Sequence, residues 1–111
     1  MKLTHKIMII SVLLGVASLT MASDAQEHLN SAISHAEDAE IHGRAGHTDA
    51  LLEHAQESLT HAQAAYKTSP ENNQHLAASI KLLEEAISQA KQDHAEVATG
   101  QVREALSHMR R

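Results

Sequence analysis

Cysteine is missing from this 111-residue chain, which excludes disulfides, zinc fingers, iron–sulfur clusters and thiol catalysis. Tryptophan and phenylalanine are missing too, and Tyr66 is the only tyrosine, so a core must be built from alanine, leucine, isoleucine and valine. Such residues suit closely packed helices, whereas a sheet would need more β-branched and aromatic side chains. One proline and four glycines allow few turns, so the elements are expected to be few and long.

Positive charge is scarce as well, because nine lysines and arginines are set against 14 aspartates and glutamates, for a net charge of −5. This balance repels nucleic acid and argues against a basic binding groove. Histidine is the exception to these shortages, with ten residues in the chain. A function that uses imidazole is therefore the first to consider.

The first 22 residues are predicted to be a secretory signal peptide. A positive start at Lys2 and Lys6 is followed by an apolar run over 7–16 and by small residues, and we expect cleavage after Ala22 or Ala25. A membrane anchor would need ~20 apolar residues, and a lipid anchor would need a cysteine. We therefore expect the mature chain to be exported and free of the membrane, and to be periplasmic if the host is Gram-negative.

The remainder, residues 26–111, is predicted to be one domain of four helices. Alanine, glutamate, glutamine, leucine and lysine dominate it, and all are strong helix formers. Two features mark helix starts: Ser69 as an N-cap before Pro70, and Asp93 followed three residues later by Glu96. With a further break at 43–46, the helices are expected at 24–43, 47–67, 70–91 and 94–110.

An internal duplication relates the two halves at an offset of 47 residues. Aligning 28–64 with 75–111 gives nine identities in 37 ungapped pairs, and three of these are histidine pairs. The repeated unit is a helical hairpin, predicted over 26–67 and 70–111. Because separate hairpins would expose their apolar faces, the predicted fold class is all-α, an antiparallel up-down four-helix bundle.

All histidines of the predicted mature chain fall at the same position of a seven-residue repeat. This position lies along one edge of each helix. Idle surface histidines would not all fall at one such position. Residues seven apart are separated by about 10.5 Å along a helix, so two of them cannot readily share one metal ion. The nine residues are His28, His35, His42, His47, His54, His61, His75, His94 and His108.

An antiparallel hairpin supplies partners across its helices, because residues at one level have a constant index sum, 89 in the first hairpin and 183 in the second. We call each cross-helix pair of histidines a rung. Two levels of the second hairpin lack a rung, since His94 faces Gln89 and Leu82 faces Gln101. The predicted rungs are His28–His61, His35–His54, His42–His47 and His75–His108.

Carboxylates three or four residues from these histidines add oxygen ligands. Asp38 and Glu57 stand between the rungs of the first hairpin, and Glu71 and Glu104 each precede a histidine by four residues. Helix salt bridges are the alternative explanation of any one of them. Imidazole suits Cu(II), Ni(II) and Zn(II), and the Irving–Williams order favours Cu(II). The set predicts several divalent ions per chain, bound with modest selectivity and mostly in the first hairpin.

The histidine pattern, with HAEDAEIHGRAGHTDALLEHAQESLTHAQAA at 35–65, resembles that of the small metal-binding protein family. The resemblance extends over 28–108 and implies a histidine-rich periplasmic protein that binds several divalent metal ions, copper especially, and buffers or scavenges them. It also implies that the nine histidines are ligands. The pattern fails at Leu82, Gln89 and Gln101, which implies a lower capacity in the second hairpin.

Catalysis is not expected. A ferritin-like di-iron site would need Glu-x-x-His pairs, which the sequence lacks, and haem attachment through Cys-x-x-Cys-His is impossible. The alternative function is a non-enzymatic helical adaptor or chaperone, or a bundle whose histidines respond to pH. Metal titration at fixed pH separates these functions, because a pH switch needs no metal. We expect a monomer whose partners are metal ions, and the sequence identifies no protein partner.

Overall fold

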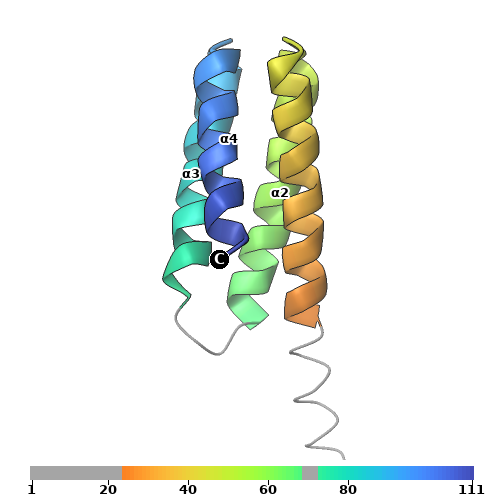
Figure 1. Ribbon diagram of the computed structural model, residues 1–111, viewed down its shortest axis with the longest axis vertical. Helices are drawn as coiled ribbons and strands as arrows, with labels where there is room; N and C mark the ends of the chain where they lie inside the picture. The colour runs from red at the N-terminus through yellow and green to blue at the C-terminus, as the bar shows by residue number, and fades with distance from the viewer. Residues whose placement is uncertain (1–23, 69–72) are drawn as a thin grey trace, which may run out of the picture.

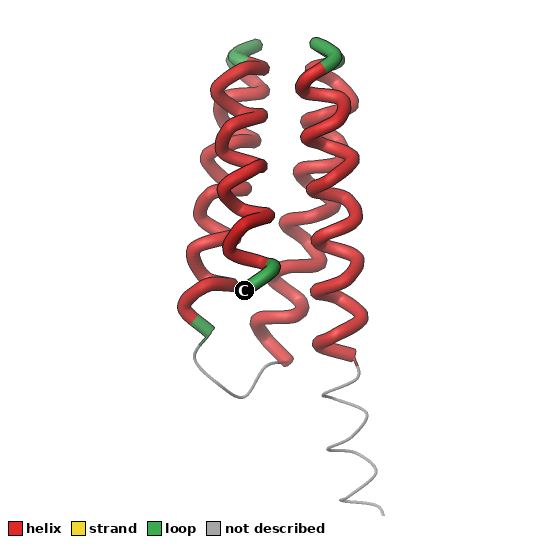
Figure 2. The backbone as a smooth tube through the Cα atoms, in the orientation of Figure 1, coloured by secondary structure: helices red, strands yellow, loops and turns green. Residues whose placement is uncertain are grey.

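Two antiparallel helical hairpins lie side by side, with both hairpin turns at the same end of the molecule (Figures 1 and 2). This computed structural model describes residues 24–68 and 73–111. The arrangement confirms the predicted all-α four-helix bundle made of two hairpins. Among the described residues, no helix is both long enough and apolar enough to cross a membrane. The helices are residues 24–44, α2 (Thr48–Thr68), α3 (Gln74–Lys91) and α4 (Ala95–Met109).

The predicted helix ends agree with the structure to within one residue, except at the start of α3. That helix begins at Gln74, and Asn73 is its N-cap, with a side chain that accepts a hydrogen bond from the Leu76 N–H at 3.0 Å. The prediction that α3 begins at Pro70 is therefore wrong. Asparagine and serine are equally favoured N-caps, so local preference alone did not choose between them. The predicted signal peptide, Ser69, Pro70 and Glu71 lie outside the described residues.

The turn of the first hairpin is a Schellman motif, which ends a helix with two backbone hydrogen bonds. The Gly46 N–H donates to the Gly43 carbonyl at 3.1 Å, and the His47 N–H donates to the His42 carbonyl at 2.9 Å. The motif needs a left-handed residue after the helix, and Gly46 supplies it with a φ of 80°. The turn therefore fixes which residues of the two helices stand opposite each other.

The turn of the second hairpin repeats this motif 47 residues later. Here the Asp93 N–H donates to the Ala90 carbonyl at 3.0 Å, and the His94 N–H donates to the Gln89 carbonyl at 2.9 Å. Asp93 has a φ of 63°, so it occupies the left-handed position. The prediction that Asp93 caps α4 in a capping box with Glu96 is wrong, because the N-cap of α4 is His94 and its side chain makes no capping bond.

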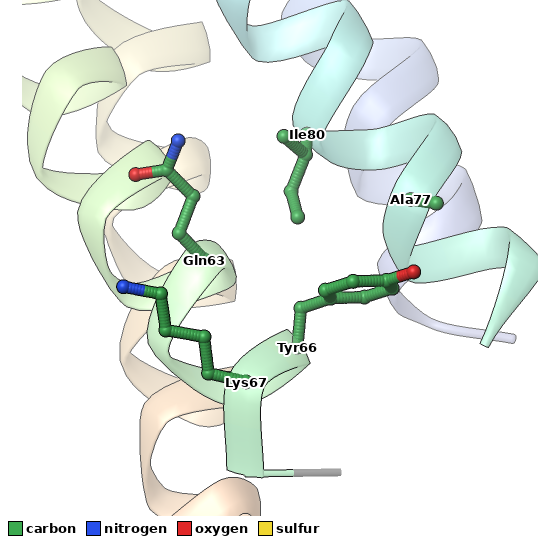
Figure 3. A pocket seen from close by; sticks show the side chains of 5 residues that line it. All are labelled: Gln63, Tyr66, Lys67, Ala77 and Ile80. Carbon is green, nitrogen blue, oxygen red and sulfur yellow. The ribbon is translucent and has the colours of Figure 1, made fainter. Parts of the chain in front are cut away.

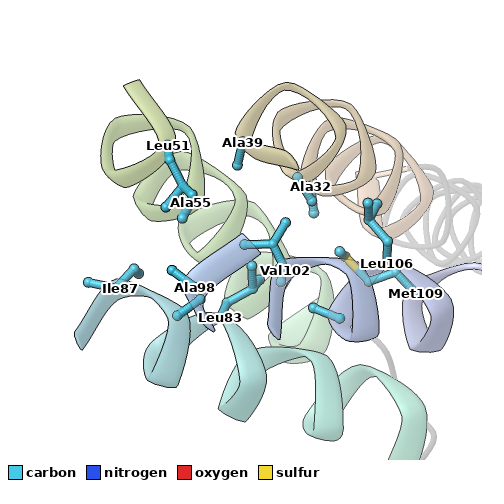
Figure 4. Packing of buried hydrophobic residues seen from close by; sticks show 14 of the residues in the cluster. Ala32, Ala39, Leu51, Ala55, Leu83, Ile87, Ala98, Val102, Leu106 and Met109 are labelled. Atoms are coloured by element: carbon cyan, nitrogen blue, oxygen red, sulfur yellow. The ribbon is translucent and has the colours of Figure 1, made fainter. Parts of the chain in front are cut away.

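The core is built mainly from small side chains, which point from all four helices into a common interior (Figure 4). Ten of its 17 buried hydrophobic residues are alanines, and the largest fully buried side chains include Leu51, Leu83 and Leu106. Such a core allows the helices to approach closely. At Gly43, for example, an added Cβ would collide with the Thr99 side chain and would lie 2.5 Å from a methyl group of Leu51.

Charged side chains connect the two hairpins on one side of the bundle, where the first helix meets α4. Glu40 accepts a hydrogen bond from the Arg103 Nε at 3.0 Å, and Glu37 pairs with Arg110. On the opposite side of the bundle, α2 packs against α3. The edge between the first helix and α2 and the edge between α3 and α4 therefore lie on opposite sides of the bundle. The histidines occupy these two edges.

Candidate metal centre

All four predicted rungs are present, and in each the two rings face each other through their Nδ1 atoms. Because a neutral imidazole has one N–H and one bare nitrogen, a facing pair of Nδ1 atoms is satisfied when one donates and the other accepts. A metal ion could take the place of that shared proton. The Nδ1–Nδ1 distances are 3.1 Å in His28–His61, 3.4 Å in His35–His54, 3.5 Å in His42–His47 and 3.1 Å in His75–His108.

The turn itself builds the rung nearest to it. His42 and His47 are the C3 and C″ residues of the Schellman motif, whose side chains commonly meet. Gln89 and His94 hold the same positions in the second turn, and there the His94 Nδ1 lies 2.8 Å from the Gln89 Oε1. Each further rung is seven residues along both helices, which is about two helical turns. The constant index sum predicted the rungs correctly because the Schellman motif sets the register of the two helices. The helical period then repeats that register at each further rung.

The three rungs of the first hairpin form one continuous column of six rings. Between neighbouring rungs, His35 stacks on His61 with centroids 5.7 Å apart at 7°, and His42 stacks on His54 with centroids 5.4 Å apart at 4°. Within rungs the rings are inclined by 27° to 40°. Nitrogen lone pairs lie in the ring planes, so parallel stacked rings do not aim at one point. The chelating pairs are therefore the rungs.

Carboxylates join the middle rung. Atoms of His35, Asp38 and His54 that can bind a metal lie within 4.8 Å of one another, and all three side chains are half-buried. The Glu57 Oε2 lies 2.9 Å from the His35 Nδ1. Two of the predicted oxygen ligands thus stand at the same rung, one from each helix.

The predicted carboxylate ligands of the second hairpin do not join its rung in the described residues. Glu104 is exposed and makes no ion pair with His108, and Glu71 is outside the described residues. At one of the two levels where the second hairpin lacks a rung, Leu82 packs against the core and the Gln101 Oε1 is buried without a hydrogen-bond partner. The second hairpin therefore has one rung among its described residues.

Two aspartates that were not predicted as metal ligands stand near the rung at the turn. Asp49 and Asp93 line a cleft of about 490 Å³ together with His42 and His47. Asp93 comes from the other hairpin, so only the packing of the hairpins brings it there. Asp93 is not three or four residues from a histidine on its own helix, so helical spacing does not indicate it as a ligand.

A further cleft, of about 440 Å³, lies between α2 and α3. The Tyr66 ring and the Ile80 side chain border it from the two helices, and Gln63, Lys67 and Ala77 complete its lining (Figure 3). No histidine or carboxylate is among these residues. This cleft therefore offers no metal ligand of these types, whereas the group of three potential ligands found in the described residues, His35, Asp38 and His54, lies at a rung.

Comparison with known proteins agrees with this geometry. No curated protein matched the sequence. The model of a family described as small metal-binding protein matches residues 1–111. The metal-binding description fits a chain whose described residues bring eight of its histidines together in pairs. This chain belongs to the small metal-binding protein family.

Proposed function

We propose that the protein is exported and buffers, scavenges or stores divalent metal ions, which it binds at the histidine rungs. The observation that carries this proposal is the Nδ1–Nδ1 distance of 3.1 to 3.5 Å in the four rungs. An ion about 2.0–2.1 Å from each nitrogen would subtend an N–metal–N angle of about 100–120°. Such an ion fits between the rings with little movement of either helix.

Cu(II) is the proposed principal ion, with Ni(II) and Zn(II) as competitors. Imidazole ligands suit all three, and the Irving–Williams order places Cu(II) first. Rungs at the edges of the bundle leave coordination positions open to water, and this supports modest selectivity and ready exchange. Those are properties of a buffer, and nothing in the arrangement calls for catalysis.

Binding is expected to stabilise the fold. A rung exists only when its hairpin is folded, so an ion that bridges it binds the native state in preference to the unfolded chain. At a hundredfold excess over Kd, each site adds ~2.7 kcal/mol to the free energy of unfolding. The core of small side chains makes the melting temperature a sensitive measure of this effect.

The decisive experiment is a competitive titration of the purified protein with Cu(II), Ni(II) and Zn(II), with bound metal counted by elemental analysis. A triple variant, His28→Ala, His35→Ala and His42→Ala, opens all three rungs of the first hairpin, and His75→Ala opens the rung of the second. We expect the triple variant to lose most of the bound metal and His75→Ala to lose the smaller part. Equal losses would contradict binding at the rungs.

The same titration at fixed pH tests the alternative function. A bundle that responds to pH alone would change its helicity or melting temperature with acid and would be indifferent to the metal. A protein that retains no ion at neutral pH would contradict the proposed function.

A further inference from the structure

The middle rung of the first hairpin differs from the others in its neighbours. His35 and His54 are each followed three residues later by a carboxylate, Asp38 on the first helix and Glu57 on α2. No other rung has an acid at either of these positions. The residues three after the remaining rung histidines are Ser31, Ala45, Ala50, Ala64, Ala78 and Arg111.

Antiparallel helices place these two carboxylates on opposite sides of the rung. Each lies about 4.5 Å further along its own chain, and the two chains run in opposite directions. Local two-fold symmetry therefore relates His35 and Asp38 to His54 and Glu57. The observed positions agree, because the Glu57 Oε2 reaches across to the His35 Nδ1 at 2.9 Å, and ligating atoms of Asp38, His35 and His54 lie within 4.8 Å of one another.

The separation of the two nitrogens favours a tetrahedral ion. With metal–nitrogen bonds of about 2.0–2.1 Å, the 3.4 Å between the Nδ1 atoms of His35 and His54 gives an angle of about 110°. A square-planar ion would need nitrogens about 2.9 Å apart as neighbours or about 4.1 Å apart on opposite sides. Two nitrogens and two carboxylate oxygens complete four ligands, the number that Zn(II) takes in closed sites.

Neighbouring rings hold the middle rung in this geometry. His35 stacks on His61 and His54 stacks on His42, so each ring of the rung is contacted by a ring of the next rung. The His35 side chain is 28% exposed and that of Glu57 is 44% exposed, so an ion can still enter from solvent. An ion bound at the His35 Nδ1 would also have the Glu57 Oε2 within reach, because the two atoms are 2.9 Å apart.

We propose that His35, Asp38, His54 and Glu57 form one tetrahedral Zn(II) site that fills before the other rungs and has four protein ligands. This inference rests on the proposed function and adds to it a rank order of sites and a different coordination geometry. Cu(II) prefers tetragonal coordination, so the middle rung is where Zn(II) competes best with Cu(II). The other three rungs, with two histidines each, remain the general binding sites.

Co(II) tests the geometry, because four-coordinate tetrahedral Co(II) absorbs visible light far more strongly than six-coordinate Co(II). We expect the first equivalent of Co(II) added to the purified protein to give the strong bands, and one equivalent of Zn(II) to abolish them. Later equivalents should add little absorbance. Weak bands from the first equivalent onward would overturn the tetrahedral site.

The double variant Asp38→Asn and Glu57→Gln removes the two oxygen ligands and keeps every histidine. We expect it to lose the strong bands and at least tenfold in affinity for the first Zn(II), with binding at the other rungs retained. Glu84→Gln is the matched control, because it removes an exposed acid of α3 that is not among the predicted ligands. A double variant with unchanged first-site affinity would overturn this inference and leave the proposed function intact, whereas a wild-type protein that binds no ion would contradict the proposed function.

Discussion

Gly46 and Asp93 stand 47 residues apart in the chain and occupy the same left-handed backbone position in the two hairpin turns, with φ angles of 80° and 63°. Both supply the N–H that closes the shorter hydrogen-bonded ring of a Schellman motif. The duplication is therefore visible in the backbone even where the residue types differ. The difference matters energetically, because glycine adopts this conformation freely and an aspartate does not.

Asp93→Gly should stabilise the protein. The substitution removes the steric cost of a Cβ in the left-handed conformation, and the greater freedom of glycine in the unfolded chain offsets part of that benefit. We therefore expect the free energy of unfolding to rise by about 0.5–1 kcal/mol. Thermal unfolding of the metal-free protein, followed by circular dichroism, measures it. The reciprocal change, Gly46→Ala, introduces a Cβ at the same position and should destabilise by about 1 kcal/mol. A loss of stability in Asp93→Gly would contradict equivalence of the two turns.

Gly43→Ala should destabilise the contact between the hairpins. The new Cβ would collide with Thr99 on α4, so the helices must separate, at a cost of about 1–3 kcal/mol. Gly100→Ala is the matched control, since that position is helical and has no atom within 4 Å of an added Cβ. It should stabilise by about 0.5–1 kcal/mol through helix propensity. Denaturant unfolding of the two variants should therefore give shifts of opposite sign.

Gln89→His should create a fifth rung. The Gln89 Oε1 already lies 2.8 Å from the His94 Nδ1, and the pair holds the same turn positions as His42 and His47. We expect about one further ion per chain in elemental analysis. Gln92→His, in the same turn but at the C-cap of α3, serves as the control and should add none. Equal gains in the two variants would mean that added histidine, and not the pairing, raises capacity.

Metal binding should weaken in acid. Imidazole must lose its proton to become a ligand, so affinity is full at the higher pH and falls as protons compete, between pH ~7.5 and ~5. Equilibrium dialysis at constant ionic strength across this range measures the loss. Retention of every ion at pH 5 would point to sites made of carboxylates alone.

The pairing of the histidines was predictable from the sequence because it depends on two quantities, the helical period and the turn. The choice of Asn73 over Ser69 as the cap of α3 was not, since both residue types are good N-caps. Asp93 was misinterpreted for a related reason: aspartate is both a favoured N-cap and one of the few residues tolerated in the left-handed region. Only the hydrogen bonds that end α3 decide between these roles.

The spacing of the carboxylates left a similar ambiguity. Glu57 is three residues after His54 and four before His61, so it could have joined either of two rungs. Its contact is with His35, a residue of the opposite helix at the level of His54. Side-chain rotamers make that choice, and a periodicity argument carries no information about rotamers.

In each hairpin one buried serine donates a hydrogen bond to the backbone of the opposite helix. The serine is on the second helix of the first hairpin and on the first helix of the second hairpin. In the first hairpin the Ser58 hydroxyl on α2 donates to the Ala32 carbonyl at 2.7 Å. In the second hairpin the Ser79 hydroxyl on α3 donates to the Ala105 carbonyl at 3.1 Å. Ser79 is the counterpart of Ala32 at the 47-residue offset, and Ala105 is the counterpart of Ser58. Each hairpin thus has one serine and one alanine at this close contact, on opposite helices.

The exchange predicts a rescue. Ser58→Ala removes the hydrogen bond and should cost about 1 kcal/mol. Ala32→Ser alone would crowd a second hydroxyl into the contact and should cost about 1–3 kcal/mol. Together they recreate the arrangement of the second hairpin, in which the hydroxyl on the first helix donates to the carbonyl on the second. We therefore expect the double variant to be more stable than either single variant, as measured by chemical denaturation without metal. A double variant whose destabilisation equals the sum of the two single effects would show that the two hairpins reach their close helix contact by different means.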